Sequence, residues 1–469
     1  MTKGISRIAL VAGIGFAAMG FAVAAEAESL TDAIAMAYSQ NPGLGRARAQ
    51  QRATDETYVQ TRANFGPSLS LGASQSYADR GQNFAGDRSF QTVSLSANQT
   101  LFASGGLSAS LEASKAGVKS GQESLRSTES SLLLNVISVY TAVRRDQEAL
   151  KISQDNYDIL KAQLDQTQAQ FEAGQLTRTD VAQSQARLSA SAAALSAAQA
   201  QLDSDRASYT AIVGQAPTAL DPVPDLPGLP ADFNTALSTA EKNNPDLAAA
   251  QYADDAAAAR VKAERSAFGP TVGLSVSSGK TGVAGQLGST LEDTSATVRV
   301  SVPLFSSGLN GSRVRQALEN ETASRLQVEE TRRTVVSTVS QAWSNMIAAR
   351  SAVTSNQEQV KAAQIAAEGV KTEQQVGLRT NIEVLNAEQE LKSAQLDLIN
   401  AQRSQYVAAA QLLSVTGNLT AKAFVPNLET YDPQKNFNKV QSKGWTPIVP
   451  VVHAVDGAAE GLLGNGRGK

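Results

Sequence analysis

Residues 65–77 read FGPSLSLGASQSY, and the prediction of the fold starts from this stretch. After the Phe-Gly-Pro turn, Leu69, Leu71, Ala73 and Tyr77 alternate with small, mostly polar residues. A period of two is typical of a β-strand with one apolar and one polar face. An ordinary half-buried sheet alternates in the same way, so the pattern by itself leaves open whether the apolar face meets lipid or protein.

The same turn returns 203 residues later as Phe268-Gly269-Pro270, again followed by an alternating stretch. Other short motifs recur at this offset, among them Asn41-Pro42 with Asn244-Pro245 and Leu101-Phe102 with Leu304-Phe305. One constant offset over the whole series predicts two tandem structural repeats.

Four strands are predicted, at residues 67–79, 89–103, 270–279 and 294–305. Strands of about ten residues with an apolar outer face suit a bilayer-spanning barrel, but such barrels start at about eight strands. Unpaired sheet edges cannot lie in lipid. Several copies must therefore share one barrel, and three copies would supply twelve strands around a passage.

Two proline-free stretches predict very long helices. Residues 107–173 would form a helix of about 100 Å, too long for a compact domain. The apolar residues of this helix stand seven apart: Val136, Val143, Leu150, Tyr157, Leu164 and Phe171. A sustained period of seven indicates a left-handed coiled coil. The shorter helices 31–64 and 178–213 would lie end to end beside it, and the second repeat would do the same.

The ends of the chain and the segment between the repeats complete the domain plan. Lys3, Arg7, an apolar run and Ala25-Glu26-Ala27 indicate a cleaved signal peptide, although a membrane anchor is the alternative. The predicted domains are a signal peptide (1–27), a first repeat (28–216), a proline-rich linker (217–230), a second repeat (231–417) and a partly disordered tail (418–469).

Composition narrows the function classes. The 41 Lys+Arg and 44 Asp+Glu nearly balance, which gives no reason to expect nucleic-acid binding. The chain has no cysteine, and its one histidine, His453, lies in the tail. No phosphate loop, catalytic triad or zinc motif is present. We therefore expect neither an enzyme nor a cofactor or metal site.

At this point the chain resembles the TolC-type outer-membrane efflux and secretion channels, from Leu30 to about Gly417. The motifs that carry the resemblance are the duplicated Asn-Pro pairs, the Leu-Phe-x-Ser-Gly strand exits and the two helix turns, 171–181 and 376–387. The resemblance implies a mixed α and β membrane protein: a homotrimer whose twelve-stranded β-barrel continues as a long α-helical coiled-coil barrel through the periplasm.

The resemblance also implies a pore constriction at the second turn, on Glu383 and Asn386. The first residue keeps the charge expected there and the second does not, so one ring of three carboxylates is expected. Like charges in a narrow ring would raise some apparent pKa values, and a carboxylate ring favours cations. The alternative for Glu383 and Asp180 is a solvated charge at a helix start, where the helix dipole favours it.

A periplasmic gate network is implied on Thr179, Asp180, Arg379 and Gln374. Gln374 stands where the family has a tyrosine, which departs from the pattern. The glycines of the two helix turns at the tunnel tip, Gly174 and Gly377, are expected to allow the backbone to turn and not to bind a ligand.

Together these observations predict a passive export duct of the outer membrane, with energy supplied by an inner-membrane ABC or proton-driven transporter through a periplasmic adaptor. Type I secretion and multidrug efflux both fit. The segment Phe437-Asn438-Lys439-Val440, followed by Trp445, resembles members of the type I secretion class. The alternatives are a periplasmic adaptor and a coiled-coil structural stalk.

Overall fold

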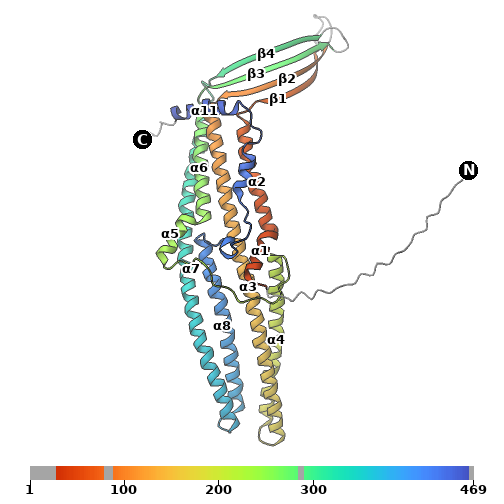
Figure 1. Cartoon of the computed structure of the whole chain (residues 1–469), viewed down its shortest axis with the longest axis vertical. Helices are drawn as coiled ribbons and strands as arrows, with labels where there is room; N and C mark the ends of the chain where they lie inside the picture. Colours follow the sequence, from red (N-terminus) through yellow and green to blue (C-terminus); the bar gives the residue numbers. More distant parts are fainter. Residues whose placement is uncertain (1–27, 79–87, 284–289, 464–469) are drawn as a thin grey trace, which may run out of the picture.

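The computed structural model describes residues 28–78, 88–283 and 290–463, so the predicted signal peptide lies outside the described residues. The molecule is elongated, with a sheet at one end and a rod of helices beneath it (Figure 1). In chain order the elements are α1 (Leu30–Gln40), α2 (Pro42–Ala63), β1 (Ser68–Ala78), β2 (Arg88–Phe102), α3 (Gly106–Glu172), α4 (Arg178–Val213), α5 (Phe233–Asn243), α6 (Pro245–Ser266), β3 (Thr271–Val283), β4 (Thr290–Ser301), α7 (Leu309–Gln375), α8 (Asn381–Val415), α9 (Ala421–Phe424), α10 (Pro433–Val440) and α11 (Val449–Leu463).

The two longest helices, α3 and α7, have 67 residues each and run from the sheet to the far end of the rod (Figure 1). Beside α3 lie α1 and α2 in its upper part and α4 in its lower part, while α5, α6 and α8 lie in the same way beside α7. Three shorter helices thus lie beside each long one. The single helix predicted over 31–64 is divided into α1 and α2, because Asn41 before Pro42 is extended and Pro42 has no N–H to continue the helix.

The duplicated Asn-Pro motifs form the joint between the short helices. Asn41 caps α2 by accepting a hydrogen bond from Leu44 N, and its Nδ2 donates to the carbonyl of Ile212 at the end of α4 (3.0 Å). In the second half, Asn244 caps α6 and donates to the carbonyl of Val415 at the end of α8 (2.9 Å). One side chain therefore satisfies a backbone N–H at the start of one helix and a backbone carbonyl at the end of another.

The sheet is antiparallel in the order β1-β2-β3-β4, so the β2–β3 pair joins the two halves of the chain. Three strand boundaries differ from the prediction. β3 continues to Val283 and β4 already begins at Thr290, because the pairing extends past the apolar alternation through partners such as Lys280 and Glu292. β4 ends at Ser301, shortly before Pro303, which has no N–H to donate.

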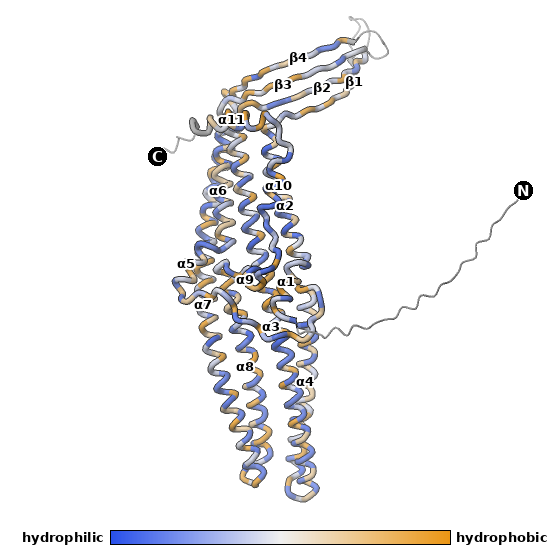
Figure 2. The backbone as a smooth tube through the Cα atoms, in the orientation of Figure 1, coloured by the Kyte–Doolittle hydropathy of each residue, from blue (hydrophilic) through white to orange (hydrophobic). Residues whose placement is uncertain are grey.

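The two faces of the sheet differ in polarity. One face exposes apolar side chains, including Leu69 (70%), Leu71 (74%) and Val298 (63%). The other carries hydroxyl pairs such as Ser70–Ser96 (2.8 Å) and Ser277–Ser295 (2.9 Å). The helices mix both kinds of residue along their length (Figure 2). Within the described residues, no helix combines the length and apolar character needed to cross a membrane.

The buried seam of the lower rod is more polar than the heptad pattern suggested. In α3, Val136 and Val143 of the predicted row are buried, but Leu164 is half-buried and Phe171 is exposed. The fully buried positions there are instead Ser153, Asn156, Leu160, Gln163 and Thr167. The difference arises because α3 contacts both α4 and α8, so it buries a second face beside the apolar row.

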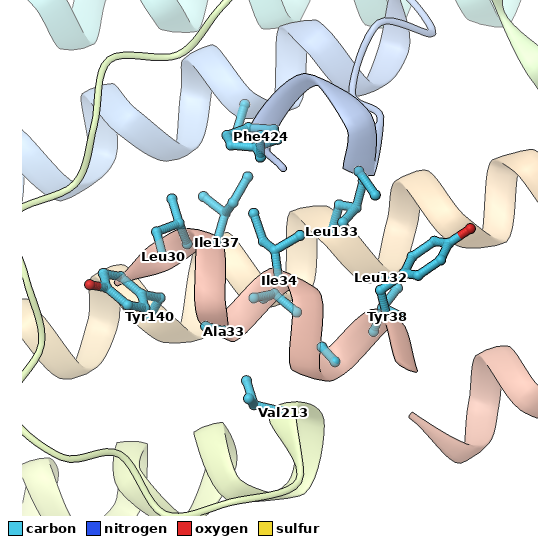
Figure 3. Packing of buried hydrophobic residues seen from close by; sticks show 14 of the residues in the cluster. Leu30, Ala33, Ile34, Tyr38, Leu132, Leu133, Ile137, Tyr140, Val213 and Phe424 are labelled. Carbon is cyan, nitrogen blue, oxygen red and sulfur yellow. The ribbon is translucent and has the colours of Figure 1, made fainter. Parts of the chain in front are cut away.

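The largest apolar core lies halfway along the rod. Figure 3 shows Leu30 and Ile34 of α1 packed among Leu133 and Ile137 of α3 and Phe424 of α9. Tyr140 holds the linker 217–230 in place, because its hydroxyl lies within hydrogen-bonding distance of the carbonyls of Glu28 (2.8 Å) and Asp221 (2.9 Å). The N-terminal segment, the linker and the tail therefore meet at one place.

The tail, for which partial disorder was predicted, contains α9, α10 and α11. Residues 464–469 lie outside the described residues, so the predicted partial disorder stays a prediction. The tail follows α2 upward toward the sheet. Asn436 donates to Asp55 (2.7 Å), and the Phe437 ring packs edge-on against Tyr58 (5.1 Å). These contacts order the tail, and composition alone did not indicate them because the partner residues lie near the other end of the chain.

Candidate gate at the helical tips

The rod ends in two hairpins, α3–α4 and α7–α8, whose turns share one backbone design. Gly174 and Gly377 both have a left-handed φ, of 75° and 80°. Gln175 N donates to the carbonyl of Gln170 (2.9 Å), and Leu378 N donates to that of Glu373 (2.9 Å). This six-residue bond with a glycine in the left-handed region is a Schellman helix ending.

In the first turn, Asp180 caps the start of its own helix, α4. Its Oδ2 accepts hydrogen bonds from Thr177 N (3.0 Å) and Thr177 Oγ1 (2.6 Å). The Thr177 hydroxyl, followed by its N–H, holds the pKa of the Asp180 carboxyl below its usual value. Thr179 is exposed beside it.

In the second turn, Glu383 takes the same capping role and adds an ion pair. Its Oε2 accepts from Thr380 N (2.8 Å) and Thr380 Oγ1 (2.8 Å), and its Oε1 accepts from Arg379 Nη1 (2.8 Å). Arg379 Nε also donates to Glu373 (2.8 Å). The Thr380 N–H, its hydroxyl and Arg379 together lower the pKa of Glu383 to about 2.

The predicted gate network is not assembled within one copy of the chain. Arg379 bonds to Glu373 and Glu383 of its own turn, while Asp180 bonds to Thr177. Gln374 contributes its backbone carbonyl, which accepts from Gly377 N (3.0 Å). Contacts of these residues with a neighbouring copy stay a prediction.

A buried polar network that the sequence analysis missed does join the two hairpins. Gln163 Nε2 of α3 donates to Asn381 Oδ1 at the start of α8 (2.9 Å), and Asn381 Nδ2 donates to Ser184 Oγ of α4 (2.9 Å). Ser184 Oγ in turn lies 3.4 Å from Thr167 Oγ1. We call these four residues the tip network; each is at most 7% exposed.

The tip network is electrically neutral, and its members form hydrogen bonds with one another. Buried amides and hydroxyls with complete partners give an interface one defined geometry, and each is costly to leave unpaired. No signal in the sequence indicated this network, because its members lie far apart along the chain and their burial depends on how the helices pack.

Near the tip network, Asn386 links the hairpins a second time. Its Oδ1 accepts a hydrogen bond from Arg187 Nη2 of α4 (2.9 Å). Two and six residues after Asn386, α8 buries Glu388 and Lys392, which are 9% and 7% exposed. Burial raises the pKa of Glu388 and lowers that of Lys392. The described residues contain no group of three or more His, Cys, Asp or Glu side chains that could hold a metal ion.

Comparison with known proteins adds a family to this geometry. The family model described as outer membrane efflux protein matches residues 33–215 and 236–418. The chain is 32% identical over 422 residues to the outer membrane efflux protein BepC of Brucella suis biovar 1 (strain 1330), covering 90% of this chain and 92% of BepC. It is 26% identical over 488 residues to the outer membrane protein TolC of Escherichia coli (strain K12), covering 97% of each.

The fold also matches solved structures. The Campylobacter jejuni CmeC outer membrane channel superimposes with a TM-score of 0.76 at 16% identity, covering 88% of this chain and 89% of that channel. At this identity the likeness concerns the fold: a small sheet continued by a rod of long paired helices.

Proposed function

The chain belongs to the outer membrane efflux protein family, and from this we propose that three copies form one duct that conducts exported molecules from the periplasmic side to the outside. The chain is accordingly an outer-membrane channel protein that extends into the periplasm. The number of copies, the partners, the cargo and the residues of the gate are the parts that we propose.

The observation that carries the proposal is the sheet. In the part of the chain that the structure describes, β1 and β4 each pair on one side only, while one sheet face exposes apolar residues. An edge with free N–H and C=O groups cannot lie in lipid. Pairing of β4 with β1 of the next copy would remove every edge, and three copies would give a bore that side chains do not fill.

The rod supplies the rest of the duct. If each sheet leads into paired helices, a closed ring of sheets leads into a closed ring of helices with a continuous lumen. Such a duct has no energy source of its own. We propose that a periplasmic adaptor docks it to an inner-membrane ABC or proton-driven transporter, and that its cargo is a protein of a type I secretion route or a small molecule for efflux.

We place the gate at the tips. The tip network and the Arg187–Asn386 bond support this, because they hold the α7–α8 hairpin against the α3–α4 hairpin. Opening requires the two hairpins to separate, so these contacts must break. Glu383 and Asn386 are proposed to line the constriction when the tips of three copies converge.

The first test is assembly. Cells that express the full chain should yield a trimer in the outer-membrane fraction, which dissociates in detergent only on heating. Purified trimer should then open ion-conducting channels in planar bilayers. A soluble monomer in the periplasmic fraction would instead support an adaptor or a structural stalk.

The second test concerns Glu383. A ring of carboxylates attracts cations, so the reversal potential of wild-type channels in a salt gradient should indicate cation selectivity. Glu383→Ala should reduce this selectivity, whereas Glu390→Ala, an exposed carboxylate two turns along α8, should leave it nearly unchanged. Equal selectivity in all three proteins would remove Glu383 from the constriction.

A further inference from the structure

The tail ends in a helix whose position the channel model does not explain. Figure 1 shows α11 lying across the top of the rod, at the foot of the sheet, and not along the rod axis. Its inner face packs on the first repeat: Val449 and Val452 form a core cluster with Phe65 and Leu111. The helix is therefore held where the strands pass into the rod.

A buried carboxylate fixes the orientation of α11. Asp456 is fully buried, and its two oxygens accept hydrogen bonds from Ala103 N (2.7 Å), Gly105 N (3.0 Å), Ser108 N (3.1 Å) and Ser108 Oγ (3.2 Å). It thereby satisfies the N–H groups at the start of α3, whose N-cap Gly105 has no side chain. Because this contact admits one rotation of the helix, the opposite face must point outward.

The outward face is apolar. Val451 and Val455, four residues apart and so on one side of the helix, are 59% and 50% exposed. Trp445, just before the helix, is 56% exposed. The other exposed residues between Val449 and Ala459 are uncharged or weakly basic, and Lys439 and Lys443 are exposed on the approach to Trp445.

Apolar side chains are also exposed at the foot of the sheet, where α11 lies. At the foot of the sheet, Leu69 near the start of β1 is 70% exposed and Val300 near the end of β4 is 64% exposed. If the sheet spans the outer membrane, its foot lies where lipid meets the periplasm. Helices with an apolar face lie in this layer, and tryptophan is enriched there because its ring is amphipathic.

We propose that α11 is an interfacial helix, whose Val451–Val455 face and the preceding Trp445 rest in the periplasm-facing leaflet of the outer membrane. The exposed lysines before it suit the acidic headgroups of phospholipids in that leaflet. The tail would then set the depth of the barrel foot in the bilayer. Because Asp456 bonds α11 to the start of α3, the rod would be held at the same depth. The inference rests on the proposed membrane-spanning sheet.

The chain has two tryptophans, Trp343 and Trp445, which permits a direct test. Three full-length proteins with one tryptophan each are reconstituted into phosphatidylethanolamine–phosphatidylglycerol vesicles. The first carries Trp343→Phe and keeps Trp445. The second carries Trp343→Phe, Trp445→Phe and Val455→Trp. The third carries Trp445→Phe and keeps Trp343, which packs against Phe233 at the start of α5, halfway down the rod.

Lipids brominated near the headgroup end of the acyl chain quench tryptophans that lie at that depth. We expect the fluorescence of the first two proteins to fall in brominated vesicles and that of the third to stay unchanged. In the first protein, adding Val451→Asp and Val455→Asp should reduce the quenching, because charged side chains withdraw that face from lipid.

Two results would overturn the proposal. Quenching of Trp445 and of the residue at 455 by aqueous iodide, without quenching by brominated lipid, would place the face in water. Protection from both quenchers would mean that another copy of the chain covers it. Channel currents recorded from the same preparations separate both results from failure of the proposed function. Trimers that conduct ions but show no quenching by brominated lipid would reject the interfacial helix alone.

Discussion

The two hairpin tips have the same backbone conformation, but their side chains differ in burial and in ion pairing. Each turn combines a left-handed glycine, a Schellman bond and a threonine whose N–H and hydroxyl donate to the carboxylate three residues later. The second turn nevertheless buries Asn381 and pairs Arg379 with two glutamates, whereas the first turn is largely exposed.

Three aligned positions account for this difference. At the offset of 203, Gln170 corresponds to Glu373, Leu176 to Arg379 and Arg178 to Asn381. The first two substitutions add the ion pairs of the second turn. The third replaces an exposed arginine by a short amide that fits between Gln163 and Ser184. A duplicated scaffold therefore became asymmetric through a few side chains, while its backbone design was retained.

The largest effect is expected from exchanging the third pair. Asn381→Arg removes both amide hydrogen bonds and places a cation in a site that is 2% exposed. The new charge and the former partners of Asn381 would then be unpaired in a buried site, which should lower the free energy of unfolding by about 3 kcal/mol or more. Urea unfolding of the purified protein, followed by circular dichroism, measures this loss, and channels in planar bilayers should open more often.

Arg178→Asn is the matched control for that exchange. Arg178 is exposed, so its replacement should change the free energy of unfolding by no more than about 0.5 kcal/mol and leave channel opening unaltered. Equal effects of the two substitutions would show that Asn381 does not hold the hairpins together.

A smaller effect, similar in both tips, is expected from the shared caps. Thr177→Ala and Thr380→Ala each remove a hydroxyl that donates to the capping carboxylate. Loss of a threonine cap costs about 0.5–2 kcal/mol, and unfolding of the two variants should show comparable losses. A much larger loss of unfolding free energy for Thr380→Ala would mean that the cap also holds Asn381 in position for its contacts with the first hairpin.

The smallest effect concerns the pH dependence of the second turn. The pKa of Glu383 is lowered to about 2 in the folded chain, below its usual value of 4.5. Its stabilising contribution is therefore complete above about pH 4.5 and is lost as pH falls toward 2. The melting-temperature difference between wild type and Glu383→Gln should persist at pH 5 and shrink as pH falls below about 4.5.

Arg379→Leu, which copies Leu176 of the first turn, sharpens this prediction. Without the guanidinium, the pKa of Glu383 should move back toward its usual value, so the difference should disappear at a higher pH than in the wild-type background. If the melting-temperature difference already disappears at a pH above the usual pKa of a glutamate, the carboxylates of neighbouring copies repel one another, as expected for a closed ring.

The parts of the fold that depend on local patterns could be predicted from the amino-acid sequence. The alternation after Phe65 indicated β1 and the absence of proline indicated α3, whereas Asn41-Pro42, expected inside one helix 31–64, separates α1 from α2. Features whose partners are distant could not be predicted in this way. The packing of the tail on Asp55 and Tyr58, for example, is not visible in the tail's own composition.

The candidate site shows the same division. Gly377, Arg379 and Glu383 were singled out from the second turn, and each does shape that turn. Gln163 and Ser184 were passed over because nothing near them in the sequence distinguishes a buried glutamine or serine from an exposed one. Their common partner, Asn381, is 218 residues from Gln163 and 197 residues from Ser184.

By itself the amino-acid sequence determined the strands, the helix lengths, the caps and the duplication, because each depends on residues within a few turns of one another or on direct self-similarity. Tertiary structure alone decided which polar residues are buried, which turn binds its neighbour and where the tail lies. Those outcomes depend on how α3, α4 and α8 pack over their lengths, and a small rotation of one helix would pair a different set of side chains.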